Sequence, residues 1–134
     1  MDKARQYMGI ARKAGLLAVG EESCGAAFSL GKARLLLLAA DASPNARKRA
    51  EGYLYGHRAP MMALPWTKEE LSELLGKQGC GMVCFTDLAL AGRFASAMAE
   101  TLPDWQETAA LLTQREEKAR RRKAAPRKST SRGK

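Results

Sequence analysis

The sequence predicts an α/β domain in which a mixed, largely parallel sheet lies between layers of helices. Short apolar runs alternate regularly with segments of helical spacing, as in folds where strands and helices follow one another. Glycines and capping residues stand at the junctions between these segments, where elements are expected to end. The chain has 134 residues, of which 46% are apolar, so it is long enough for one domain with one core.

The first part of the chain is predicted to form a helix, a short strand and a second helix. Small and apolar residues recur at three- and four-residue spacing over residues 2–14, and Gly15 ends that pattern. The apolar run at residues 16–19 predicts a strand. Residues 21–30 are predicted to form the second helix, because their acidic start suits the positive end of a helix dipole and Gly31 follows them.

The middle of the chain is predicted to contain a buried strand, a capped helix and a third strand. Residues 35–39 are apolar without alternation, as in a central strand that is covered on both faces. Ser43 is a predicted N-cap, with Pro44 at the first helical position. That helix runs through residues 46–55, and a turn then leads into a strand at residues 61–64.

The next part repeats this alternation. Thr67 and Glu70 show the spacing of a capping box, which predicts a short helix ending at Leu75. Residues 82–86 are predicted to form a fourth strand. Asp87 is the predicted cap of the last core helix, which extends to about residue 99.

Three regions are expected along the chain. Residues 1–102 form the core domain, and residues 103–122 form a helical extension with Trp105, Ala109 and Leu112 along one side. Residues 123–134 consist of Lys, Arg, Pro, Ser, Thr, Ala and Gly. Because this composition cannot bury a core, a disordered basic tail is predicted there.

The positive charge of the protein is concentrated at its C-terminal end. Residues 115–134 contain ten Lys or Arg and two Glu, a net charge of +8, whereas the whole chain carries +9. The preceding 114 residues are therefore nearly neutral. A cationic tail of this kind attracts nucleic-acid phosphates without selecting their sequence.

The sequence contains no pattern that indicates catalysis, a metal site or a membrane span. It has no nucleophile elbow, no Walker loop and no paired-histidine motif, and its single histidine is His57. The odd number of cysteines predicts buried thiols, with Cys80 and Cys84 facing the same side of a strand. No apolar run approaches the roughly 18 residues that cross a bilayer, and no signal-peptide pattern is present. We therefore expect a cytoplasmic, noncatalytic protein with no cofactor, no metal and no membrane partner.

The most informative stretch is Gly20-Glu21-Glu22-Ser23, which joins a predicted strand to the start of a predicted helix. A helix N-terminus leaves backbone N–H groups unpaired and carries partial positive charge. A glycine before it allows another backbone or a ligand to approach closely. Taken alone, the stretch is most often only a helix start, but on a small α/β domain it also provides a docking point.

Other conspicuous segments have simpler interpretations. The run Arg47-Lys48-Arg49 is interpreted as a solvated helix face, and Trp66 as a core or edge anchor. The glycine-rich residues 76–81 precede a strand instead of opening a helix, so they are not expected to form a phosphate-binding loop.

Several motifs in this order resemble those of the bacterial YlxQ-like proteins, members of the kink-turn-binding ribosomal protein superfamily (the seven-Ae/thirty-e group). The resemblance covers about residues 3–100, and its specificity comes from the order and spacing of the motifs. The matching segments are ARKAGLLAVGEE at residues 11–22, GKARL at 31–35, AADAS at 39–43, TKEEL at 67–71, GK at 76–77, and the strand leading to TD at 86–87.

This resemblance implies a three-layer α-β-α sandwich with a four-stranded mixed sheet and a noncatalytic RNA-binding function. In such proteins the start of the second helix enters the groove of a sharply bent RNA and recognises sheared G·A pairs, while the loop before the last strand packs against a flipped-out nucleotide. RNA recognition of this kind favours distorted sites over regular helices. The implied partners are structured RNA, with ribosomal RNA and ribosomal proteins as candidates, and the protein is expected to be a monomer.

The resemblance assigns two surfaces and some flanking cations to RNA binding. The family has Asn and Glu where this chain has Glu22 and Ser23, and it has basic residues where Ala26 and Leu30 stand. Both basic phosphate contacts of that helix are therefore missing, and flanking cations and the tail are expected to compensate for them. The assigned residues are Gly20, Glu21, Glu22 and Ser23 for the first surface, Lys77, Gln78, Gly79 and Cys80 for the second, and Lys13, Lys32 and Arg34 as flanking cations.

A second hypothesis belongs to a different functional class. With the basic residues lost at positions 26 and 30, the fold would serve as a protein-interaction adapter on the ribosome or the transcription machinery. The helix predicted within residues 104–122 would then dock on a partner protein.

Overall fold

The computed structural model describes residues 1–124, and most of the predicted basic tail, residues 125–134, lies outside that part of the chain. The order of elements is the one that the sequence predicts, with one short 3-10 helix (η1) added. The elements are α1 (Asp2–Lys13), β1 (Leu17–Val19), α2 (Glu21–Ser29), β2 (Leu35–Leu38), α3 (Pro44–Leu54), β3 (Met61–Ala63), α4 (Lys68–Leu75), β4 (Met82–Phe85), α5 (Leu88–Ala99), η1 (Pro103–Trp105) and α6 (Gln106–Ala124).

The predicted caps hold the starts of three helices. The Ser43 hydroxyl oxygen accepts a hydrogen bond from the Ala46 N–H at 3.1 Å, which satisfies one of the unpaired donors at the start of α3. Thr67 and Glu70 form the predicted capping box of α4, and the carboxylate of Asp87 caps α5. Local sequence signals therefore define where these helices begin.

The four strands form one mixed sheet in the order β1-β4-β2-β3. β4 lies between β1 and β2 and is antiparallel to both, whereas β2 and β3 are parallel. The prediction of a largely parallel sheet is therefore wrong, because after α4 the chain returns to the centre of the sheet, and strand order is not encoded in the local pattern. Since antiparallel neighbours start where their partners end, the loop before β4 lies beside the turn that follows β1.

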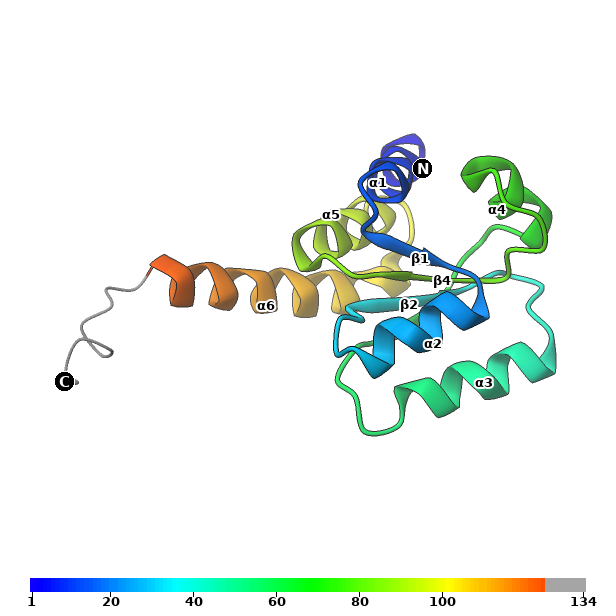
Figure 1. Ribbon diagram of the computed structural model, residues 1–134. Helices are drawn as coiled ribbons and strands as arrows, with labels where there is room; N and C mark the ends of the chain where they lie inside the picture. Colours follow the sequence, from blue (N-terminus) through cyan, green and yellow to red (C-terminus); the bar gives the residue numbers. More distant parts are fainter. Residues whose placement is uncertain (125–134) are drawn as a thin grey trace.

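Helices cover both faces of the sheet, which confirms the three-layer α-β-α sandwich. In Figure 1, α2 and α3 lie on one side of the sheet, and α1, α4 and α5 lie on the other. Side chains of β2 alternate between these layers: Leu36 and Leu38 pack with the cluster under α2 and α3, while Leu35 and Leu37 pack with the opposite cluster. The whole of β2 is buried, as predicted for a central strand.

The hydrophobic core continues past residue 102, where the core domain was expected to end. Trp105, Ala109 and Leu112 are buried in the cluster that also contains Phe94 of α5. The ring centroids of Phe94 and Trp105 lie 5.8 Å apart in an edge-to-face arrangement, which suits aromatic packing. The start of α6 is therefore part of the sandwich, while its C-terminal half is largely exposed and projects away from the sheet (Figure 1).

The three cysteines are buried free thiols. Cys80 and Cys84 do not face the same side, because Cys80 packs in the cluster that contains Phe94 and Cys84 packs in the cluster under α2 and α3. The expectation of a shared side placed both residues on one strand, but β4 begins at Met82 and Cys80 precedes it.

Residues 1–124 show neither a membrane-spanning helix nor a group of metal ligands. None of the helices there combines the length and the apolar character that a bilayer span requires. No three His, Cys, Asp or Glu side chains in the same residues lie together as a set that could hold a metal ion.

Candidate nucleic-acid interface

Gly20 forms the turn from β1 into α2 and is the N-terminal cap of that helix. Its backbone has φ 98° and ψ 159°, a conformation that L side chains rarely adopt. Its N–H donates to the carbonyl oxygen of Met82 at 2.8 Å, which ties the turn to the start of β4. No side chain caps α2, so N–H groups of its first turn are left to a ligand or to water.

Lys77 connects this turn to the loop before β4. Its Nζ donates a hydrogen bond to the carbonyl oxygen of Val19 at 3.1 Å. A Cβ built on Gly20 would lie 3.3 Å from the same Nζ. The two surfaces that the resemblance assigns to RNA binding are therefore side by side, and we call the combined surface of residues 20–23 and 77–79 the two-turn site.

The loop part of the two-turn site is exposed and borders a groove. Lys77, Gln78 and Gly79 are exposed, and Gly76 ends α4 in the left-handed conformation at φ 70°. Together with the exposed edge of α4 these residues line a groove of about 780 Å³. In the first turn of α2, Glu22 and Ser23 are exposed, while Glu21 is half-buried.

Cys80, the fourth residue assigned to the loop surface, does not reach the surface. Its side chain is 1% exposed, and its N–H donates to the Ser72 hydroxyl oxygen at 3.3 Å. Burial raises the pKa of the thiol above its ordinary value. The assignment of its side chain to RNA contact is therefore corrected: Cys80 anchors the loop in the core.

The flanking cations lie away from the two-turn site. Lys32 and Arg34 follow the C-terminus of α2, whose nine residues separate them from Gly20 by roughly 14 Å at 1.5 Å per residue. Lys13 ends α1 and leads into the start of β1, whereas Gly20 follows its end. Lys32 and Arg34 therefore stand at the opposite end of α2 from the two-turn site, and RNA contact by these three residues stays a prediction.

A cation that the sequence interpretation missed lies beside the site instead. Arg49 of α3 pairs with Glu21 of α2, with 3.4 Å between Nε and Oε1. The helices lie close enough that a Cβ on Gly25 would come within 2.9 Å of the Tyr53 ring. The basic run of α3 therefore lies alongside α2. Its composition was visible in the sequence, but its position depends on packing between the helices.

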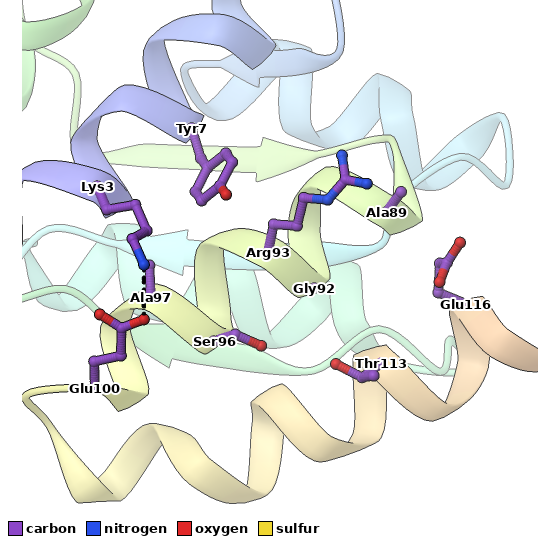
Figure 2. A pocket seen from close by; sticks show the side chains of 10 residues that line it. All are labelled: Lys3, Tyr7, Ala89, Gly92, Arg93, Ser96, Ala97, Glu100, Thr113 and Glu116. Carbon is purple, nitrogen blue, oxygen red and sulfur yellow. Dashed lines mark hydrogen bonds and ion pairs between the residues drawn. The ribbon is translucent and has the colours of Figure 1, made fainter.

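A further pocket lies between α1, α5 and α6, on the other side of the sheet (Figure 2). The Lys3 amine points toward Glu100 and forms an ion pair with it at 3.0 Å, and this hydrogen bond raises the pKa of Lys3. Both side chains are more than half exposed, so the pair contributes little to stability. The pocket is lined by no Cys or His, and two of its four charged side chains, Lys3 and Glu100, already pair with each other.

Comparison with known proteins shows the fold but no family. No protein-family model and no curated protein matches this sequence. The chain is similar in structure to a protein with unknown function from Bacillus halodurans, with a TM-score of 0.63 and 22% sequence identity. The match covers 70% of this chain and 94% of the other, so the sandwich is a fold that the two proteins share.

Proposed function

We propose that this chain is a noncatalytic, cytoplasmic RNA-binding protein of ribosomal-protein type and a YlxQ-like member of the kink-turn-binding superfamily. Its RNA would contain a kink-turn or a similarly sharp bend. The observation that carries the proposal is the contact of Lys77 with Val19, because it joins the helix start and the loop into one surface. A bent RNA presents two faces at one corner, and such a surface can contact both.

The groups at the two-turn site suit an exposed, distorted base pair. The start of α2 offers backbone donors and partial positive charge. The exposed carboxylate of Glu22 accepts hydrogen bonds, and guanine offers N1–H and N2–H₂ donors where its edge is free. Lys77 and Gln78 add a cation and an amide on the loop side.

The charge near the site favours RNA more than the sequence of α2 alone suggests. The side chain of Arg49 lies against Glu21 and offsets one of the two carboxylates at the helix start. Arg47 and Lys48 are exposed in the same helix. These cations take the place of the basic residues missing at positions 26 and 30, and the basic C-terminal end adds attraction that depends on salt.

A titration of the full chain with two RNAs tests this proposal. One RNA carries a kink-turn, and the other is a straight duplex of the same length and composition. We expect tighter binding of the bent RNA, and we expect Glu22→Gln to reduce that preference. Glu107→Gln, the same change at an exposed position of α6, should leave the preference intact. Equal affinity for the two RNAs would contradict the proposal.

The adapter hypothesis has less support. It requires the helix within residues 104–122 to be free for a partner protein, but Trp105, Ala109 and Leu112 are already buried against the domain. The exposed face of α6 and its C-terminal half remain for docking. Full binding of a partner protein after nuclease treatment would favour the adapter over the RNA-binding protein.

A further inference from the structure

A second cationic surface lies at the opposite end of α2 from the two-turn site. It is a cleft of about 560 Å³ between the end of α2, the turn from α3 to β3, the start of α5 and the exposed half of α6. Among residues 1–124, no Asp or Glu lines this cleft, and apart from His57 its ionisable side chains are Arg or Lys. These are Arg34, Arg58, Arg115, Lys118 and Arg122.

These five cations have no neutralising partner within the described chain. None of them is in an ion pair among residues 1–124, where the ion pairs involve other residues. The sequence of residues 125–134 contains no Asp or Glu side chain. Like charges held together in this way attract anions strongly.

Two of the guanidinium groups are held in place by backbone carbonyl oxygens. Arg115 Nη1 donates to the carbonyl oxygen of Arg58 at 3.0 Å, and Arg34 Nη1 donates to that of Gly31 at 3.1 Å. Each guanidinium keeps other N–H donors free for a ligand, but the Nε of Arg115 is buried without any partner. Burial, and then the charge of Arg58, lower the pKa of Arg115. An anion in the cleft would offset both effects.

We propose that this cleft binds the phosphate backbone of an RNA strand. A row of guanidinium and ammonium groups matches a chain of phosphates, and arginine contacts phosphate through two parallel hydrogen bonds. The cations line a concave cleft, which a strand can enter and a flat bilayer cannot. Contacts to phosphate carry no sequence information, so the cleft would hold RNA without selecting its sequence.

This inference goes beyond the proposed recognition of bent RNA and does not depend on it. Residues 103–122 were expected to form a helical extension, and residues 123–134 a disordered basic tail. In the structure, Arg115, Lys118 and Arg122 belong to α6 and converge with Arg34 and Arg58 from the sandwich. Part of the positive charge near the C-terminus therefore has a defined position in the fold.

Two variants with the same loss of charge test the cleft. The cleft variant combines Arg58→Gln, Lys118→Gln and Arg122→Gln, and the control variant combines Arg93→Gln, Arg121→Gln and Lys123→Gln. All six side chains are exposed, and none is in an ion pair within residues 1–124. Circular dichroism and thermal unfolding verify that both variants fold.

The probe is a fluorescent straight RNA duplex, titrated by anisotropy between 50 and 200 mM salt, roughly the range over which phosphate contacts dominate. We expect the cleft variant to bind about tenfold more weakly than the control variant, with a salt slope lower by about 2 to 3. In the unmodified protein, we expect the amide resonances of Gly31 and Gly56 to shift when the duplex is added. Equal losses of affinity in the two variants, or no shift at these glycines, would overturn the proposal.

Two comparisons separate this proposal from others. Polyglutamate of the same total charge should compete poorly with the duplex, and competition as strong as that of RNA would contradict a phosphate site. The straight duplex contains no bend, so preference for bent RNA does not enter the result. A protein that binds RNA through the cleft but shows no preference for bent RNA would contradict the proposed function alone.

Discussion

Lys77 and Val19 are 58 residues apart in sequence, yet the Nζ of Lys77 donates a hydrogen bond to the carbonyl oxygen of Val19 at 3.1 Å. The contact follows from the sheet, in which β4 lies antiparallel to β1, so that its preceding loop meets the turn at Gly20. The Lys77 side chain thereby connects the loop before β4 to the end of β1 at the proposed RNA site. The first predictions concern this contact.

Replacing Lys77 with Met should weaken binding of bent RNA about fivefold to tenfold and lower the salt slope by about 1, since one phosphate contact is lost. The free energy of unfolding should change by less than about 1 kcal/mol, because Lys77 is exposed and loses one hydrogen bond. Lys123→Met is the matched control, because Lys123 is an exposed lysine at the C-terminal end of α6. Equal effects of the two substitutions on RNA binding would contradict the assignment.

Replacing Gly20 with Ala should destabilise the protein by about 1 to 3 kcal/mol, because φ 98° with ψ 159° is accessible essentially only to glycine. The new Cβ would also lie 3.3 Å from Lys77 Nζ and would displace it. Gly52→Ala is the control: it lies in α3 with no other atoms near its added Cβ, and it should stabilise by about 0.5 to 1 kcal/mol. Urea unfolding measures both changes, and an unchanged stability for Gly20→Ala would contradict the turn geometry.

Arg49→Gln should weaken RNA binding several-fold, because Glu21 would then face RNA without its cation. The stability should change by less than about 0.5 kcal/mol, since the pair is largely exposed. Arg93→Gln removes the same charge from an exposed site on α5 and serves as the control in the same titration. If both variants bind RNA alike, Arg49 acts only through the net charge.

Truncation should separate the core part of α6 from the basic end. A chain ending at residue 124 should keep its thermal stability, because the core side chains of α6 all precede that position. A chain ending at residue 102 should fail to fold cooperatively, because it loses Trp105, Ala109 and Leu112 from the core. In the full chain, Trp105→Ala should cost about 3 to 5 kcal/mol. A stable chain of 102 residues would show that η1 and α6 are dispensable.

The buried thiol of Cys84 should make stability depend on alkaline pH. Burial raises its pKa from 9.0 to about 11, so the thiol stays protonated in the folded state while it ionises in the unfolded state. Its contribution is complete below pH 9.0 and is lost as the pH rises to about 11, with a slope of at most about 1.4 kcal/mol per pH unit. Urea unfolding at pH 8, 9 and 10 should show a shallower decline for Cys84→Ala. Identical declines would contradict this burial effect.

The sequence predicted the elements and several helix starts because those depend on local chemistry. The capping box at Thr67 and the N-cap at Ser43 satisfy donors a few residues away, so their spacing alone identifies them. The all-apolar run in β2 likewise identified the central strand. Trp66, interpreted as a core or edge anchor, is buried at 5% exposure.

The candidate site was less predictable because it is built from distant segments. Arg34 seemed to flank the start of α2, but it lies in the cleft at the other end of that helix. Arg49 is exposed, as expected for a solvated helix face, but the packing of α3 on α2 also places it against Glu21. Cys80 was assigned to an exposed loop surface, but its side chain is buried. It was also expected to share a strand face with Cys84, but Cys80 precedes β4, so the alternation of a strand does not apply to it. Strand order and helix packing decide these positions, and neither is encoded in residue spacing.

A nuclear magnetic resonance titration of the full chain with a kink-turn RNA tests the central claim most directly. If one bent RNA occupies the two-turn site, the backbone amides of Gly20 to Ser23 and of Lys77 to Gly79 should shift together, with the same concentration dependence. Shifts in only one of the two segments, or none in either, would contradict the claim that a single RNA contacts both turns.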